Sequence, residues 1–418
     1  MPRWICSLAI LSSLIVLSAP ILAEPLKLGF NYPQTGRYQD QGLQQRMGAF
    51  LAVEEINEAG GILGRPVELV IRNTRGDPER GAANTADLID NHGVEMLFGG
   101  SSSAVAIASG KAAKERDRIY FGTLTYSNAT TGSAGHTHMF REPFNAWMSA
   151  KALGSFLSEN YSDKKFFYIT ADYTWGWSVE ESLRQFTDTG DTSEHPGTRT
   201  PFPNALTSDF QAALEQAAAS DADVLAMVLF GDDMVRAVNI AYSMGLHDKM
   251  QIVVPNITLS MANQVGPSIM EGVIGAAPWI WNLPREAGYE RGQKFVQDFS
   301  ERYEMRPSSA AASAYSIVYQ YRDAVERAGT TNTADVIRAL EGHRYTFLKD
   351  EQEWRAFDHQ NVQSVYVVRI RPREEVLADE HSSDYFEIVH TLPGNEAVRT
   401  REEWEADRRK AGMPLTLQ

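Results

Sequence analysis

The runs Lys27-Leu-Gly-Phe-Asn31 and Val67-Glu-Leu-Val-Ile71, with the stretch Gly42–Glu58 between them, decide the fold. The two runs are short and apolar, which is typical of buried strands. In the stretch between them, apolar residues recur at helical spacing, and Gly60 and Gly61 end the helix. A strand, a helix and a second strand in this order predict a parallel βαβ unit with a right-handed crossover.

Later segments repeat this alternation. Further strands are predicted at Val94–Phe98, Arg118–Phe121, Lys165–Ile169, Val224–Phe230 and Gln251–Val254. Further helices are predicted at Val105–Arg116, Ala146–Tyr161, Met234–Met244, Gly288–Tyr303, Ser309–Ala328 and Thr333–Leu340. Strands that alternate with helices indicate an α/β fold with parallel sheets. The chain is longer than one hydrophobic core usually supports, so two lobes are expected.

The first 23 residues have the features of a secretory signal. Arg3 supplies the positive end, Ile5–Leu17 is the apolar core, and Leu22-Ala23 offers a cleavage point. The alternative is a membrane anchor, but this core is shorter than the ~20 residues that a spanning helix needs. Ile21, three residues before this cut, is less usual there than alanine, so cleavage at another point stays an alternative. We therefore expect a periplasmic protein released by signal cleavage.

Charge and cysteine content narrow the classes of protein and partner. The formal net charge of −15 becomes −16 once Arg3 is removed, and acidic residues are spread along the chain. Nucleic-acid binding is not expected, because it needs a basic surface. Cys6 is the only cysteine and lies within the signal, so the mature protein would have no disulfide. Cys6 is also too early for a lipid-anchored form.

Several short motifs in the first unit carry a family resemblance. They are Ala52-Val-Glu-Glu-Ile-Asn57, Gly60-Gly-Ile-Leu-Gly-Arg65 and Gly76-Asp-Pro78. Their order and spacing resemble the type I periplasmic solute-binding proteins of branched-chain amino-acid ABC transporters, the leucine-binding-protein-like family. The resemblance continues more loosely to about Ile370. It implies two Rossmann-like lobes with parallel sheets, joined by three hinge strands.

The resemblance also implies a division of the chain. Residues 1–23 are the signal, 24–143 with 277–362 the first lobe, 144–276 with 363–395 the second lobe, and 396–418 a charged C-terminal tail. Phe140–Pro143 would cross the first hinge. Within the last part, Tyr385–Val389 is predicted as an edge strand and Arg399–Lys410 as a solvated helix. Trp279 and Trp281 are expected in the core or at the rim of the cleft.

Small polar residues follow two predicted strands of the first lobe. Ser102 and Ser103 precede a helix, where hydroxyl groups and free N–H groups can hold an anionic head. The alternative is that one serine simply caps the helix. The resemblance implies ligand contacts for Ser102 and Ser103 and for the loop Thr125-Tyr126-Ser127, with the assignment within that loop open by one residue. It adds Gln41 as a further pocket position.

The second lobe supplies three more candidate ligand contacts through the resemblance. Trp175 holds the place of a stacking aromatic residue, although plain packing between the lobes is the alternative for it. Phe230 and Asn256 replace a tyrosine and a glutamate of the amino-acid binders. An ammonium group buried without a counter-charge is costly, so either Asp232 or Asp233 replaces that glutamate, or the ligand has no α-amino group.

No enzyme motif of the common hydrolase or dinucleotide-binding type is present in the sequence. His136 and His138 form a close pair without an obvious third metal ligand, so a loop pair is expected. The expected function is the substrate-binding component of an ABC importer, without cofactor or metal, acting as a monomer. It would pass an amino acid or related small molecule to the permease subunits of the inner membrane. The alternative is a periplasmic sensor that docks on a membrane receptor and binds a small carboxylate or amide.

Overall fold

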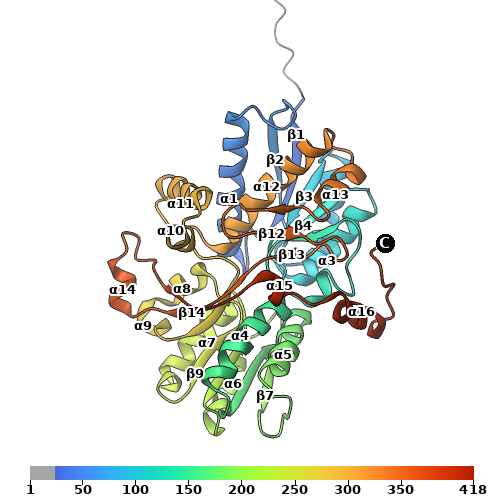
Figure 1. The fold of residues 1–418 in the computed structure, drawn as a ribbon. Helices are drawn as coiled ribbons and strands as arrows, with labels where there is room; N and C mark the ends of the chain where they lie inside the picture. The colour runs from blue at the N-terminus through green and yellow to red at the C-terminus, as the bar shows by residue number, and fades with distance from the viewer. Residues whose placement is uncertain (1–23) are drawn as a thin grey trace, which may run out of the picture.

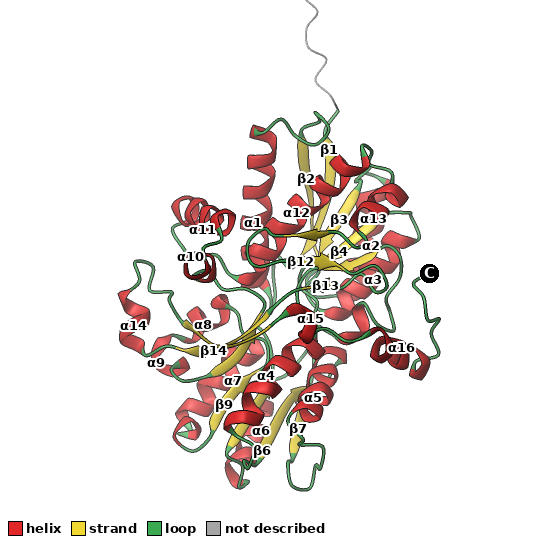
Figure 2. Cartoon of the chain, in the orientation of Figure 1, coloured by secondary structure: helices red, strands yellow, loops and turns green. Residues whose placement is uncertain are grey.

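A computed structural model describes residues 24–418. The predicted signal, residues 1–23, lies outside the described residues, so its cleavage stays a prediction. Figure 1 shows two lobes stacked one on the other, and Figure 2 shows that each contains a sheet covered by helices. The predicted α/β fold with two lobes is confirmed.

The first lobe is built on a five-stranded sheet with the order β2-β1-β3-β4-β5. The strands are β1 (Leu26–Tyr32), β2 (Val67–Asn73), β3 (Met96–Gly99), β4 (Ile119–Gly122) and β5 (Met139–Arg141). Its helices are α1 (Gln39–Glu58), α2 (Pro78–Asp90), α3 (Ser103–Lys114) and the short η1 (Asn128–Thr130). All neighbouring strands are parallel, so the carboxyl ends of β1, β3 and β4 lie at one edge of the sheet.

Three later helices, α11 (Glu290–Tyr303), α12 (Ser309–Ala328) and α13 (Thr333–Leu340), return to the first lobe. Helix α12 packs on α1, and Gly48 lies at their contact. A Cβ atom at this position would come within 2.2 Å of the Ala311 carbonyl oxygen. The two helices approach this closely because Gly48 has no side chain.

The second lobe is built on a seven-stranded sheet with the order β15-β14-β10-β9-β8-β6-β7. The strands are β6 (Phe166–Ala171), β7 (Gly197–Thr200), β8 (Val224–Val228), β9 (Gln251–Val254), β10 (Ile274–Ala277), β14 (Val365–Ile370) and β15 (Phe386–Leu392). Its helices are α4 (Ala146–Asn160), α5 (Thr174–Phe186), α6 (Thr207–Ala219), α7 (Asp232–Ser243), η2 (Leu246–Asp248), α8 (Leu259–Val265), α9 (Pro267–Met270) and α14 (Arg373–Ala378). Strands β14 and β15 are antiparallel to their neighbours, and β15 confirms the predicted edge strand.

Three segments, residues 142–145, 278–282 and 363–364, carry the chain between the lobes in the part that precedes β15. A small third sheet of β11 (Arg344–Tyr345), β12 (Gln352–Trp354) and β13 (Asn361–Val362) precedes the last of them. Lys349 ties two of the segments together. Its ammonium group donates to the carbonyl oxygens of Pro278 at 2.6 Å and Ser364 at 3.0 Å, and to the Gln363 amide oxygen at 2.7 Å. The residue boundaries predicted for the lobes stay a prediction.

The C-terminal helix α16 (Arg401–Lys410) differs from the solvated helix that the sequence predicted. Its Trp404 is 0 % exposed and its Arg408 is 1 % exposed. The charge pattern gave the wrong prediction because only part of the helix surface is exposed to solvent, while Trp404 and Arg408 turn toward the first lobe.

Trp279 and Trp281 are buried, as expected.

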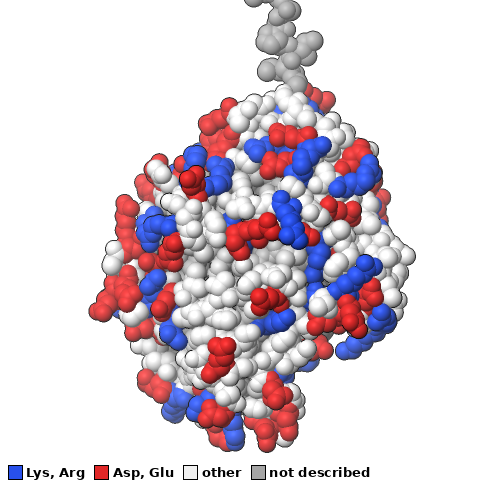
Figure 3. Space-filling view, viewed as in Figure 1, with Lys and Arg blue, Asp and Glu red and all other residues white. Residues whose placement is uncertain are grey.

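Charged side chains of both signs are mixed over the face shown in Figure 3, without a basic patch. Within residues 24–418, no helix combines the length and the apolar character needed to cross a membrane.

Candidate functional site

Residues from both lobes enclose a small cavity at the carboxyl ends of β3, β4, β6 and β8. Its free volume is about 10 Å³, which is room for one water molecule at most. The residues that line it are Tyr38, Ser101, Ser102, Ser103, Leu124, Thr125, Tyr126, Tyr173, Trp175 and Phe230. Six of the nine predicted contact residues are among them. The structure therefore brings those six together, and places Gln41, Ser127 and Asn256 outside the lining.

Ser102 and Ser103 follow β3 and have different roles. The Ser102 hydroxyl accepts a hydrogen bond from the Val105 N–H at 3.3 Å and caps α3, so the capping alternative holds for this serine. The Ser103 hydroxyl accepts a hydrogen bond from the Ser127 N–H at 3.0 Å. In both serine hydroxyls the oxygen accepts a hydrogen bond from a backbone N–H. The O–H proton of each is therefore free to point toward an acceptor in the cavity.

The loop after β4 divides its three predicted residues between the cavity and other contacts. Thr125 is fully buried and shares a hydrogen bond of 2.7 Å with the Thr130 hydroxyl. Tyr126 turns its ring into the cavity. Ser127 instead reaches the second lobe, where its hydroxyl lies 3.1 Å from that of Ser178 in α5. Tyr126 is therefore the best placed of the three for a ligand.

Aromatic rings form most of the cavity wall. The Phe230 ring lies 5.6 Å from the Tyr126 ring, 5.7 Å from the Tyr38 ring and 6.0 Å from the Trp175 ring, between centroids. All four side chains are at most 5 % exposed. Tilted and edge-to-face ring pairs at such distances are mutually stabilising. Trp175 thus contacts the cavity as expected, on a wall to which both lobes contribute.

Several buried polar groups near the cavity have no hydrogen-bond partner. They are the Trp175 indole N–H, the Gln41 amide nitrogen and both amide atoms of Asn256. Burial raises the pKa of Tyr126, and the Asn256 side chain, which is close enough to interact with the Tyr126 hydroxyl, counters that rise. Buried polar groups usually have a hydrogen-bond partner, so these groups have hydrogen-bonding capacity left for a ligand.

Asp232 and Asp233, the candidates for replacing a glutamate, do not line the cavity. Asp233 is buried and forms an ion pair with Arg37 of the first lobe, with 2.7 Å between Oδ2 and Nη1. Arg236 approaches its other oxygen at 3.4 Å. Burial raises the pKa of Asp233, and the two arginines counter that rise. Burial also raises the pKa of Asp232, and the neighbouring Asp40 adds to the rise.

Sequence reasoning missed four residues of the lining, of which Tyr38 and Tyr173 are the largest. The two hydroxyl groups interact across the cleft, and burial raises the pKa of both. Tyr173 lies two residues before the predicted Trp175 in the segment after β6, so its position was a usable signal. Tyr38 precedes α1 and offered none. Ser101 and Leu124 are direct neighbours of predicted residues.

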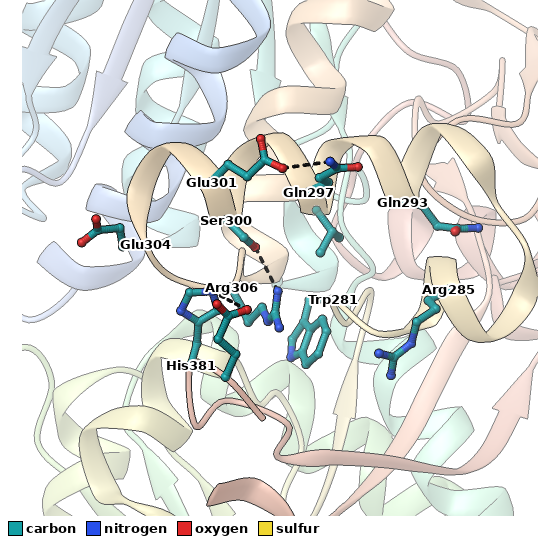
Figure 4. Close-up of a pocket in the computed structure, with 11 residues that line it drawn as sticks. Trp281, Arg285, Gln293, Gln297, Ser300, Glu301, Glu304, Arg306 and His381 are labelled. Atoms are coloured by element: carbon teal, nitrogen blue, oxygen red, sulfur yellow. Dashed lines mark hydrogen bonds and ion pairs between the residues drawn. The ribbon is translucent and has the colours of Figure 1, made fainter. Parts of the chain in front are cut away.

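A wider cavity lies elsewhere, between α10 (Leu283–Ala287), α11 and the loop after α14 (Figure 4). Trp281 forms its floor, with the guanidinium of Arg306 4.4 Å from the indole centroid and that of Arg285 5.7 Å away. The rim carries three carboxylates, Glu301, Glu304 and Glu380, as well as these two arginines. This mixed lining, open to solvent, selects no class of ligand.

Other chemistry finds little support in residues 24–418. No cluster there has the side chains to hold a metal ion. His136 and His138 lie 6.5 Å apart between ring centroids, and His138 shares a hydrogen bond of 3.0 Å with Asp117. Burial lowers the pKa of His136 to about 3, so this ring is neutral. The pair is a loop feature, as expected.

Comparison with known proteins gives a consistent result. A family model described as periplasmic binding protein matches residues 25–375. A Leu/Ile/Val-binding protein homolog 4 of Brucella melitensis is 23 % identical over 391 residues, covering 90 % of this chain and 91 % of the relative. A crystal structure of a periplasmic binding protein from Burkholderia mallei aligns with a TM-score of 0.82 at 24 % identity, covering 91 % of this chain and 98 % of the other.

A third similar protein was solved with a bound molecule. It is a solute-binding protein of an ABC transporter from Rhodopseudomonas palustris in complex with 3,4-dihydroxybenzoic acid. It aligns with a TM-score of 0.76 at 16 % identity and covers 88 % of this chain and 98 % of its own. These structures share the two-lobed α/β fold of the chain.

Proposed function

Because the chain belongs to the periplasmic binding protein family, we propose that it captures a small molecule between its lobes for an ABC importer. The lobes close over the ligand by rotation at the hinge segments. The closed form then delivers the ligand to the permease subunits in the inner membrane. Binding involves no covalent step, and the protein acts in the periplasm as a monomer.

The observation that carries this proposal is the composition of the small cavity. Its wall combines two serine hydroxyls of the first lobe with rings from both lobes. A pocket that is complete only when the lobes meet links ligand binding to closure. Closure in turn gives a partner protein a feature to recognise.

The lining also supports a class of ligand. It contains no aspartate or glutamate, and Asp233 is already paired with Arg37. An α-ammonium group would therefore be buried without a counter-charge, which is costly. The free O–H groups of Ser102 and Ser103 and the unpaired Trp175 N–H suit the oxygens of a carboxylate. We propose a small carboxylic acid without an α-amino group and with a flat apolar body.

The similar proteins are compatible with either kind of ligand. The Brucella relative is named for leucine, isoleucine and valine, whereas the Rhodopseudomonas protein holds an aromatic acid. The distinction rests on the ammonium partner, since both kinds of ligand have a carboxylate. In this chain the position of that partner is taken by Asn256, which has no charge.

Matched pairs of probes test the proposal directly. Leucine is compared with 4-methylpentanoate, and phenylalanine with 3-phenylpropanoate, because each pair differs only in the α-amino group. A probe at 100 times its Kd should add about 2.7 kcal/mol to the free energy of unfolding. We expect stabilisation by the acids in a thermal-shift assay. Stabilisation by leucine or phenylalanine alone would overturn the ligand class and leave the importer function standing.

Two serine variants show whether a stabilising probe binds in the predicted cavity. Ser103→Ala removes a hydroxyl of the lining, whereas Ser109→Ala alters a buried serine of the same helix outside it. We expect the thermal shift to fall only in Ser103→Ala. Equal shifts in the two variants would place the probe elsewhere.

Transport is tested separately in the source cell. Deletion of the gene should abolish uptake of the labelled acid, and the wild-type gene should restore it. Cell fractionation should place the protein in the periplasm. Unchanged uptake with a lost transcriptional response to the acid would favour the sensor alternative.

A further inference from the structure

The chain crosses between the lobes a fourth time after β15, in a part of the sequence that lies beyond the family match of residues 25–375. Strand β15 belongs to the sheet of the second lobe. The short helix α15 (Gly394–Ala397) lies against α4 of the second lobe and against β13. Helix α16 then packs on the first lobe, and Lys410 at its end forms an exposed ion pair with Glu181 of α5 at 3.6 Å. Figure 1 shows α15 at the junction of the lobes and α16 at the side of the molecule, near the level of this junction.

Helix α16 contacts Phe357 through the Trp404 ring, and its hydrogen bonds go to the loop that continues from the predicted ligand residues 125–127. The Trp404 indole N–H donates to the Thr131 carbonyl oxygen at 2.8 Å. The buried Arg408 guanidinium donates to the carbonyl oxygens of Gly132 and, at 3.2 Å, Gly135. Arg399, which is 2 % exposed, reaches the Asn128 carbonyl oxygen at 3.5 Å. Four backbone carbonyls of one loop are thus held by the C-terminal segment.

The same loop makes contacts with the second lobe. The Asn128 side chain donates from Nδ2 to the Ser182 hydroxyl of α5 at 3.2 Å. Its amide oxygen accepts a hydrogen bond from the backbone N–H of Trp147 in α4 at 2.9 Å. The neighbouring Ser127 hydroxyl meets Ser178 of α5. The loop therefore contacts both the C-terminal segment and the second lobe.

A buried arginine connects the two faces of the loop. Arg141 donates from Nη2 to the Thr131 hydroxyl at 2.6 Å and from Nη1 to the Ser127 carbonyl oxygen. Thr131 is the residue whose carbonyl oxygen Trp404 binds. A short chain of hydrogen bonds thus runs from Trp404 through Thr131 and Arg141 to Ser127, next to the cavity.

We propose that residues 398–418, here named the C-terminal brace, position the loop 125–135 so that Ser127 and Asn128 meet α5 when the lobes close. Trp404 and Arg408 are positioning residues in this scheme, since neither lines the cavity. The brace favours the closed arrangement by limiting the conformations of the loop before the lobes meet. The proposal depends on the two-lobed fold and the hinge, and not on the identity of the ligand.

The test measures the distance between the lobes without any ligand. Leu63 and Leu206 are exposed residues of the first and second lobe, and each is replaced by a spin-labelled cysteine in a Cys6→Ser background. The variant Trp404→Phe keeps a buried aromatic ring but loses the hydrogen bond to Thr131 and the volume of the pyrrole ring. Trp354→Phe is the matched control, because Trp354 is also 0 % exposed and its indole N–H bonds Gln320 at 3.2 Å within the first lobe.

We expect Trp404→Phe to increase the population at the longer interlobe distance roughly 2- to 10-fold, which is the effect of one hydrogen bond. Hydrogen exchange should become faster at residues 125–135 and stay unchanged in the sheets. Trp354→Phe should alter neither measurement. A chain that ends at residue 399 should show the same changes more strongly.

Two results would overturn the proposal. One is an unchanged distance distribution in Trp404→Phe together with unchanged exchange at residues 125–135. The other is an equal change in Trp354→Phe, which would mean that the brace affects general stability only. If the shortened chain does not fold, Trp404→Phe and its control still decide the question.

Discussion

The ion pair between Arg37 and Asp233 is expected to control closure of the cleft. Arg37 lies just before α1 in the first lobe, and Asp233 is the second residue of α7 in the second. Their side chains are 19 % and 4 % exposed, with 2.7 Å between the charged atoms. The contact exists only when the lobes are together. We therefore predict that Arg37→Gln shifts the protein toward the open form.

The size of the effect follows from the geometry. A hydrogen bond to a charged group contributes ~1.5 to 3 kcal/mol. Arg236 remains 3.4 Å from Asp233 in the variant, so the carboxylate keeps one partner. We expect the lower half of that range, which corresponds to a shift of about 13- to 45-fold in the equilibrium between open and closed forms.

The two single variants should not be equivalent. Arg37→Gln leaves the buried Asp233 carboxylate with a weaker set of partners, whereas Asp233→Asn removes the charge whose burial is unfavourable. Asp233→Asn should therefore open the cleft less than Arg37→Gln. In a double-mutant cycle the coupling energy of the two positions should fall between ~0.5 and 3 kcal/mol.

The interlobe distance between spin labels at positions 63 and 206 measures this equilibrium for each variant. Arg344→Gln is the control, because its ion pair with Glu351 is exposed and lies within the first lobe. A coupling energy below about 0.3 kcal/mol, the usual error for independent sites, would refute the reasoning. So would an effect of Arg344→Gln equal to that of Arg37→Gln.

Three further predictions concern other residues of the cleft and hinge. Ser102→Ala should lower the free energy of unfolding by ~1 kcal/mol through loss of the helix cap, as measured by urea denaturation. Ser103→Ala should weaken the binding of 3-phenylpropanoate roughly 5-fold, as measured by calorimetry. Gly231→Ala should impair closure, because a Cβ atom at this position would lie 2.7 Å from the Tyr38 ring and because φ is +62°. The distance between the spin labels should then shift toward the open form. Burial lowers the pKa of Lys349 to about 8 in the folded protein, below its pKa in the unfolded chain. At a pH between these two pKa values, the unfolded state therefore binds more protons than the folded state. Stability relative to Lys349→Met should therefore rise from pH 8 to pH 10 in urea denaturation, and a flat difference would contradict this.

The sequence predicted the architecture well, because strands, helices and their ends depend on local signals. Helix α12 has the predicted bounds Ser309–Ala328, since apolar residues recur along it and Gly329 follows. The order of strand and helix then restricts the topology to a few possibilities. The carboxyl ends of the parallel strands predicted where the cavity would lie.

The roles of individual side chains were harder to predict. Ser102 and Ser103 are adjacent and alike, yet only the helix geometry shows that Ser102 caps α3. Arg37 and Asp233 are far apart in sequence, and no local pattern links an arginine before one helix to an aspartate at the start of another. The charged neighbours of Trp404 predict a solvated helix around it. Its burial depends on a loop more than 250 residues earlier in the chain.

The crowding of the rings around Phe230 bears on the choice of ligand. A free volume of about 10 Å³ holds no organic acid, so a ligand must separate rings that now contact one another. Each ring pair contributes ~0.5 to 1.5 kcal/mol beyond the burial of its area. A flat aromatic acid restores ring contacts with Trp175, Tyr126 and Phe230, whereas an aliphatic side chain restores only the buried area. The cavity should therefore prefer 3-phenylpropanoate to 4-methylpentanoate by more than their difference in apolar surface predicts.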